Sequence, residues 1–275
     1  MAHRYRLYPE PNAETVLIRH CADARFVWNL ALEQANLWRP GWHATPGSAQ
    51  RMRQLAQARK GSWLGEGSSS VQQQALRDFD QALKNWWAGS HRRPRWRKAG
   101  RNVGFCVRDV TVTKLNRRWA TIAVPKCEPV RFRLSRPLPA DYGMARITLD
   151  RAGRWHISFA ASQPTLVRQI TGESIGVDLG VAATITTSAG EQYHSPTLAR
   201  SEAARLLRLQ RKLARQDKGS KRRKQTKTKI ARLKARETDR RRDFIEKSTT
   251  TLVCRYDAIV IEDLQVKNMV RSAKG

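Results

Sequence analysis

The sequence predicts a multidomain α+β protein, in which an antiparallel β-barrel with inserted helices precedes a second region of strands and a basic helix pair. Its 275 residues suffice for about two domains at a typical size of about 150 residues each. Between residues 103 and 161, short segments alternate apolar and polar side chains, which is typical of half-buried strands. Residues 12–90 instead repeat apolar positions every three or four residues, which indicates helices.

The N-terminal elements follow from local pattern. Residues 3–8 alternate and predict a short strand, which two prolines end. From residue 12 to 37 the apolar spacing predicts one or two helices, and residues 51–59 predict a shorter one. A serine run at 68–70 offers an N-cap for a further helix, which Gly89 ends.

Six alternating segments then favour a small antiparallel barrel. The apolar positions of these segments are Phe105/Val107, Val110/Val112, Ala120/Ile122/Val124, Val130/Phe132/Leu134, Ile147/Leu149 and Trp155/Ile157/Phe159. The strand at residues 3–8 is expected to join this barrel, so that the helices of residues 12–90 form an insertion.

The second region begins with the apolar segment Ile175–Leu179, which contains an acid and is expected to be a buried strand. This strand is expected to run on through residues 181–187 to a turn at residues 188–190. Residues 198–256 have helical periodicity that breaks at 217–220, which predicts an antiparallel helix pair. The chain then returns to a strand at 258–261.

The charge is strongly unbalanced. Fifty-three Lys and Arg stand against 23 Asp and Glu, which leaves a formal charge of +30 and a pI near 11.3. Residues 200–242 hold nineteen of the cations and four of the acids, so half of the excess lies in the predicted helix pair. Such an excess favours a polyanionic partner, because neutralising phosphates releases their condensed counterions.

Other classes of protein are disfavoured. The apolar runs are only a few residues long, so no membrane partner is expected, and the N-terminus lacks the apolar segment of a secretory signal. No two cysteines have C-x2-C spacing, so we expect no zinc site and four reduced thiols, at Cys21, Cys106, Cys127 and Cys254. These features predict a cytoplasmic, nucleoid-associated protein without a small-molecule substrate.

Asp178 and Glu262 are the candidate catalytic and metal-binding residues. Each carboxylate stands at an apolar strand, where burial is costly unless the group is paired or bound to a metal. Neighbouring strands would bring both to one sheet edge, where hard oxygen ligands suit Mg²⁺ and metal-assisted hydrolysis of a phosphodiester. Alternatively, either Asp178 or Glu262 alone could simply cap a turn.

Two basic clusters are candidate nucleic-acid contacts. The first, a loop with one aromatic side chain, consists of Arg92, Arg93, Arg95, Trp96, Arg97 and Lys98. Its cations could follow a phosphate backbone while Trp96 stacks on a base, although a solvated loop is an alternative. The second, on the helix pair, consists of Lys221, Arg222, Arg223 and Lys224. Few acids lie nearby to form helical ion pairs, which favours phosphate contact over a plain charged surface.

The residues resemble those of the TnpB (OrfB) family of insertion-sequence proteins, in order along the whole chain. The matching segments are Arg25–Asn29, Ser69–Leu76, Pro94–Lys98, Val124–Lys126, Ile175–Val181, Leu209–Leu213 with Lys218–Ser220, and Ile259–Met269. The resemblance implies an RNA-guided DNA endonuclease that takes its guide RNA from the transposon end and cuts target double-stranded DNA. It places Asp178 and Glu262 on the family's first two catalytic carboxylates, with Mg²⁺ as cofactor.

The resemblance also implies a domain plan. Residues 1–10 and 100–168 would form a wedge-type β-barrel, and residues 11–99 a helical recognition insertion with a start like a helix-turn-helix. Residues 172–275 would form a partial nuclease domain with the RuvC-like, RNase H-like fold, carrying the helical hairpin 198–256.

The chain departs from the family pattern in one respect. The family uses a third carboxylate and a C-x2-C zinc module downstream, and neither lies within these 275 residues. We therefore expect a C-terminally truncated member that binds Mg²⁺ weakly and is deficient in cleavage. The alternatives are a nuclease-dead nucleic-acid-binding protein, such as a repressor or RNA chaperone, and a transposase that acts directly on the element's ends.

Overall fold

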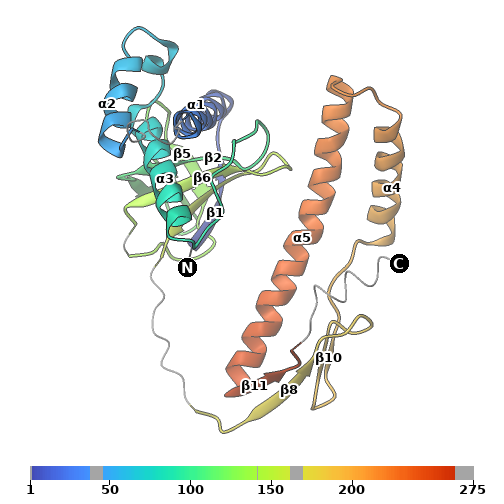
Figure 1. Ribbon diagram of the computed structural model, residues 1–275. Helices are drawn as coiled ribbons and strands as arrows, with labels where there is room; N and C mark the ends of the chain where they lie inside the picture. The colour runs from blue at the N-terminus through green and yellow to red at the C-terminus, as the bar shows by residue number, and fades with distance from the viewer. Residues whose placement is uncertain (1, 38–45, 141, 162–169, 264–275) are drawn as a thin grey trace. The chain divides into compact units, whose positions relative to one another are not determined.

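The computed structural model of the chain describes residues 2–37, 46–140, 142–161 and 170–263 (Figure 1). The chain divides into two compact units, residues 1–164 and residues 165–275. Across the described ranges, no helix combines the length and the apolar character that crossing a bilayer requires.

The first unit is built on an antiparallel sheet of seven strands in the order β2-β6-β7-β1-β5-β4-β3. The N-terminal strand lies in the middle of this sheet, between β7 and β5. The alternating segments and the N-terminal strand therefore form one sheet. The strands are β1 (Ala2–Tyr8), β2 (Val103–Arg108), β3 (Val112–Lys114), β4 (Trp119–Ile122), β5 (Val130–Arg133), β6 (Met144–Leu149) and β7 (Trp155–Ala160).

The closed barrel predicted from the sequence is not found. β2 and β3 are the two edges of the sheet, and no ladder joins them among the described residues. Closing a barrel requires the edge strands to pair along their length. β3 has only three residues, and β2 lies against α1 (Pro11–Asn36) and α3 (Ser69–Trp87) instead.

The helices of the first unit follow β1 in the chain. They are α1, α2 (Ser48–Ala58), the short 3-10 helix η1 (Trp63–Glu66) and α3. α1 is continuous over 26 residues, so the described start of the chain is a strand followed by one long helix. Ser68 caps α3 as its sequence predicted, because its hydroxyl accepts the N–H of Val71.

Helices and sheet share one hydrophobic core. Tyr5, Phe132 and Phe159 are almost fully buried in it, and their ring centroids lie 5.6 to 6.2 Å apart. Leu17 of α1 and Phe79 of α3 belong to the same core. The first unit therefore holds its helices and its sheet in fixed relative positions.

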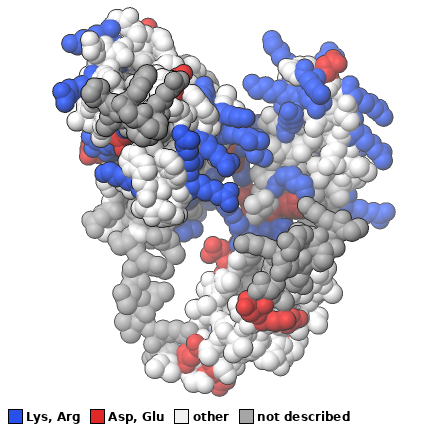
Figure 2. Space-filling view, in the orientation of Figure 1, with Lys and Arg blue, Asp and Glu red and all other residues white. Residues whose placement is uncertain are grey.

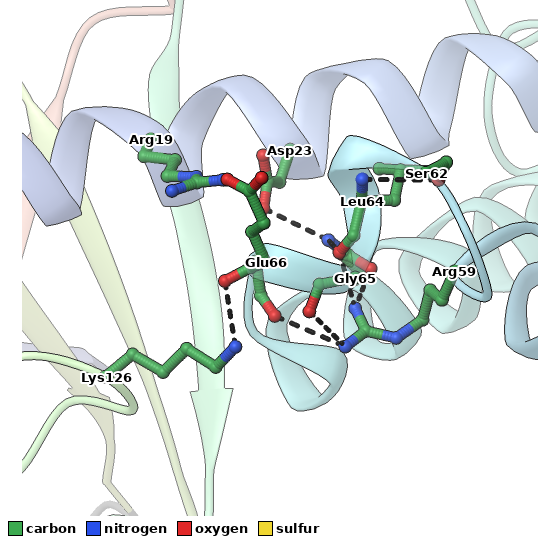
Figure 3. A network of polar contacts seen from close by, with 10 residues as sticks. Arg19, Asp23, Arg59, Ser62, Leu64, Gly65, Glu66 and Lys126 are labelled. Atoms are coloured by element: carbon green, nitrogen blue, oxygen red, sulfur yellow. Dashed lines mark hydrogen bonds and ion pairs between the residues drawn. The ribbon is translucent and has the colours of Figure 1, made fainter.

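A buried polar network fastens the turn between α2 and α3 to α1 (Figure 3). The Gln72 amide donates to Asp23 Oδ2 at 3.1 Å and to the Leu64 carbonyl at 3.0 Å. Arg59 donates to the same carbonyl, to Gln72 and to the Gly67 carbonyl. A Cβ at Gly67 would lie 2.0 Å from Asp23 Oδ2, so a larger residue forces the network apart.

The second unit contains a four-stranded sheet in the order β10-β9-β8-β11 and a helical hairpin. β8 and β11 run parallel, whereas β9 pairs antiparallel with β8 and β10. The buried core cluster of its described residues comprises Ile175, Val177, Ile185 and Leu252. The elements are β8 (Ser174–Asp178), β9 (Ile185–Thr187), β10 (Gln192–Tyr193), α4 (Arg200–Ala214), α5 (Lys221–Arg255) and β11 (Ala258–Ile261).

Candidate functional site

Asp178 and Glu262 lie at the same edge of the second unit's sheet. β8 and β11 pair in parallel, and Ile261 stands opposite Val177 in their register. The residue after Val177 is Asp178, and the residue after Ile261 is Glu262. Asp178 is the last residue of β8, and Glu262 directly follows β11, so continued alternation of side chains would put both acids on the face opposite to Val177 and Ile261. Two carboxylates thus stand at the carboxyl ends of neighbouring parallel strands.

The expectation that Asp178 lies in a buried strand is wrong. Ile175 and Val177 are buried, but Asp178 and Glu262 are exposed, as is all of β11. The alternation of β8 turns only one face toward the core, so the acids avoid the cost of burial. In the described part of the chain no three His, Cys, Asp or Glu side chains gather as a metal site, and Asp263 adjoins Glu262 beyond the end of β11. The site is therefore an exposed pair.

The face beside Asp178 carries little side-chain volume. The preceding residue on this face is Gly176, whose N–H donates to the Ser188 hydroxyl at 3.1 Å. A Cβ at Gly176 would meet Ser188 at 3.4 Å, and one at Gly180 would lie 3.0 Å from the Ala183 carbonyl oxygen. Glycine fits at both positions beside the exposed Asp178 because neighbouring atoms already occupy the space of a larger side chain.

The basic hairpin follows this sheet in the same unit. Its two helices bury Leu206 and Leu233, which lie on the apolar stripe predicted from the sequence. Arg223, one of the predicted phosphate contacts, donates to the carbonyls of Leu213 and Gln216 at the end of α4. Arg223 therefore closes the turn of the hairpin, and its predicted contact with phosphate stays a prediction.

The other three predicted cations of the hairpin, Lys221, Arg222 and Lys224, are exposed. Figure 2 shows Lys and Arg side chains gathered over the end of the hairpin, with few acids among them. This surface can hold phosphates by charge alone, without reading sequence.

Sequence reasoning missed three cations on α4 and a fourth at its C-cap. Arg208, Arg211, Lys212 and Arg215 line an open hollow of about 480 Å³. Their spacing of three and four residues places them on one helix face, which is a signal that the sequence did contain. They extend the candidate phosphate-binding surface from the turn onto α4.

The first unit holds its basic loop, residues 92–98, against α1. The Trp28 indole donates to the Arg95 carbonyl at 3.0 Å. The Asn29 amide donates to the Arg97 carbonyl at 3.0 Å, and its oxygen accepts the Arg97 N–H at 2.8 Å. The Arg97 guanidinium lies 3.6 Å from the centroid of the Trp28 ring. Two sequence motifs about 68 residues apart are thus joined, and the loop is anchored rather than freely solvated.

Anchoring divides the roles of the loop residues. Burial lowers the pKa of Arg97 to about 10, so its guanidinium stays charged at neutral pH while it stacks on Trp28. Arg93 donates to Asn36 at 2.9 Å. Arg92, Arg95, Trp96 and Lys98 are exposed, which leaves their side chains accessible to a ligand.

Comparison with known proteins identifies relatives along the whole chain. Residues 156–273 match the family model OrfB_IS605, described as a probable transposase, and residues 1–39 match HTH_OrfB_IS605, described as a helix-turn-helix domain. A "Putative RNA-guided DNA endonuclease" of Streptomyces pristinaespiralis is 34% identical over 279 residues, which cover 99% of this chain and 69% of that protein. The "Putative RNA-guided DNA endonuclease InsQ" of Escherichia coli K12 is 32% identical, with coverage of 100% and 68%.

Among solved structures, a Cas12f1–sgRNA–target DNA complex matches with a TM-score of 0.49 at 8% identity, and a CRISPR–Cas12f ternary complex with 0.41 at 11%. Each match covers 92% of this chain. The chain spans 64% and 63% of the length of those two structures.

Proposed function

The chain belongs to the TnpB/OrfB family of insertion-sequence proteins, and from this membership we propose that it is a transposon-associated, RNA-guided DNA-binding nuclease. Its partners are a guide RNA from the transposon end and target double-stranded DNA. The observation that carries the proposal is the parallel pairing of β8 with β11, because Asp178 and Glu262 stand at the carboxyl ends of these two strands. In the domain plan that we propose, residues 172–275 form the RuvC-like part.

Asp178 and Glu262 would hold Mg²⁺, because two exposed carboxylates supply the hard oxygen donors that this ion prefers. When bound, the ion supplies Lewis-acid activation for phosphodiester hydrolysis. Both carboxylates are exposed, so a backbone phosphate could approach an ion held between them. The cations of the α4–α5 hairpin hold nucleic acid by its phosphates, and base pairing with the guide would read the sequence.

Two carboxylates leave most of an octahedral shell to water, so we propose that these 275 residues by themselves bind Mg²⁺ weakly and cleave poorly. The same observation favours a second candidate function, that of a guide-dependent binder that does not cut. A transposase that joins the element's ends would instead give strand-transfer products without any guide.

The test is to purify the 275-residue chain with RNA from the element's end and to measure capture and cutting of supercoiled target DNA. We expect capture that requires a guide complementary to the target, and little or no cutting in Mg²⁺. Capture that is indifferent to the guide contradicts RNA guidance. Efficient cutting that survives Asp178→Ala removes Asp178 from the mechanism.

A further inference from the structure

The first unit contains a cavity that the proposed nuclease chemistry does not use. It has a volume of about 1,020 Å³, at the upper end of the range of about 300–1,000 Å³ for small-ligand sites. Its walls come from the anchored loop, from Leu32 and Asn36 of α1, and from Val103 and Thr148 on β2 and β6. The cavity thus lies within one packed unit, and its shape does not depend on the second unit.

The lining of this cavity is strongly cationic. Seven of its seventeen lining residues are Lys or Arg, and Asp150 is the one carboxylate among them. That carboxylate accepts the Arg154 guanidinium at 2.7 Å and the N–H groups of Ala152 and Arg154. Burial favours the neutral acid, but these hydrogen bonds prevail and lower the pKa of Asp150. A ligand therefore meets excess positive charge, which is suited to phosphate.

Trp96 gives the cavity an aromatic surface. Its side chain is 50% exposed although the backbone on both sides is fastened, at Arg95 by Trp28 and at Arg97 by Asn29. The indole is therefore displayed from a fixed backbone. An exposed ring among cations is suited to stack on a nucleobase, and base–aromatic stacking is tolerant of sequence.

We propose that this cavity binds an unpaired nucleotide of a polynucleotide, with the base stacked on Trp96 and the flanking phosphates on Arg95, Lys98 and Arg101. A base within a duplex is already stacked on its neighbours, so only an unpaired base can lie on the indole. The inference rests on the proposed function only in requiring a nucleic-acid partner. The proposed nucleotide site does not involve Asp178 or Glu262, so it would remain valid if the chain had no nuclease activity.

The experiment compares the full chain with Trp96→Ala and Trp96→Phe, and uses Trp87→Ala as the matched control. Trp87 is 64% exposed on the same unit and does not line the cavity. The probes are a fluorescent 12-nucleotide oligouridylate, a 12-nucleotide oligothymidylate and a 12-base-pair DNA duplex, measured by anisotropy at one salt concentration. The two single strands show whether the site accepts RNA, DNA or both.

We expect Trp96→Ala to weaken single-strand binding about tenfold, in line with about 1–3 kcal/mol per stacked base. Trp96→Phe should stay within about twofold of the wild type, and the duplex should be affected much less than the single strands by either change, because only its two terminal base pairs expose a base face. In a second measurement, a 5-iodouridine in the oligouridylate should crosslink to the peptide that contains Trp96.

An unchanged single-strand affinity without a crosslink at Trp96 overturns the proposal. So does an equal loss for Trp87→Ala, or a loss for the duplex that equals the loss for the single strands. Circular dichroism of each variant separates these outcomes from misfolding.

Discussion

The two units have similar charge but very different hydrophobic cores. Residues 1–164 contain 28 Lys and Arg against 11 Asp and Glu, and residues 165–275 contain 25 against 12. Among the described residues, thirty buried apolar side chains form the core of the first unit, whereas four form that of the second. The first unit therefore fixes its cations with aromatic and backbone partners, and the second displays them along helices. Positive charge and buried packing are therefore distributed independently between the two units.

The tryptophans allow the two units to be followed separately. All nine lie between residues 28 and 155, so tryptophan fluorescence reports unfolding of the first unit alone. Far-ultraviolet circular dichroism also reports the 35-residue helix α5 of the second unit.

The largest effect should come from truncating a buried aromatic side chain in the core of the first unit. Phe159 contacts the rings of Tyr5, Phe132 and Tyr142, so Phe159→Ala should lower the free energy of unfolding by about 3–5 kcal/mol. Leu252→Ala in the small core of the second unit should lower the free energy of unfolding by about 2–3 kcal/mol, because fewer buried side chains surround the space that the substitution leaves. Denaturant titration should show Phe159→Ala in the fluorescence, and Leu252→Ala only in the dichroism. A shift of both signals by both variants would mean that the units unfold together.

The next effect concerns the polar network of the first unit. Gly67→Ala places a methyl group against Asp23 and Gln72, so it should cost about 1–3 kcal/mol of stability. Gly47→Ala is the matched control, because nothing lies within 4 Å of its Cβ and its φ is −69°. The control should cost less than about 1 kcal/mol, which comes from replacing glycine at the N-cap of α2. Equal fluorescence midpoints for both variants would show that the network is not tight.

Asn29→Ala tests whether side-chain hydrogen bonds hold the loop at residues 92–98 in place. It removes both side-chain hydrogen bonds to Arg97 and should cost about 1–2 kcal/mol, without changing the charge of the cavity. Asn29 is a positioning residue, so single-strand affinity should fall while the slope of affinity against salt stays constant. Hydrogen exchange of residues 92–98 should rise. Unchanged exchange in that segment would contradict the anchoring.

A smaller effect should appear with pH. Burial lowers the pKa of His156 to about 4, and it lowers the pKa of His20 as well. The folded state then binds fewer protons than the unfolded state, so stability is complete above about pH 6.5 and declines as the pH falls toward about 4. At pH 5 we expect the free energy of unfolding to have fallen by about 1 kcal/mol because of His156, after allowing for the partial solvent access of this side chain. His156→Gln should flatten the fluorescence-detected decline, and an unaltered slope would exclude His156 as its source.

Much of the fold could be predicted because its elements have local signals. Alternation located the strands of the first sheet, and the pairing of β8 with β11 followed from two apolar strands that each end in an acid. The openness of the first sheet had no such signal, because closure depends on what packs against β2 and on the length of β3. The exposure of Asp178 was misjudged because a short apolar segment does not reveal which face is covered.

The candidate sites divide in the same way. The sequence predicted the basic loop and Trp96, but not that Trp28 and Asn29 hold the loop, since hydrogen bonds across about 68 residues leave no periodic trace. The sequence did not predict that Arg223 closes the hairpin turn, because an arginine in a basic run looks the same whether it binds backbone carbonyls or a phosphate. The predicted motif segment Leu264–Met269 lies outside the described residues.

The central claim is that Asp178 and Glu262 share one face and together bind a divalent cation. Titration of the chain with Mn²⁺, followed by electron paramagnetic resonance, tests it directly, because Mn²⁺ accepts the same oxygen donors as Mg²⁺. Asp178→Asn and Glu262→Gln should each weaken Mn²⁺ binding about tenfold or more, since each removes one of two carboxylate ligands. Asp263→Asn, which removes the same charge from the adjacent residue, should leave the affinity unchanged. Equal affinities for the wild type and all three variants would contradict the claim.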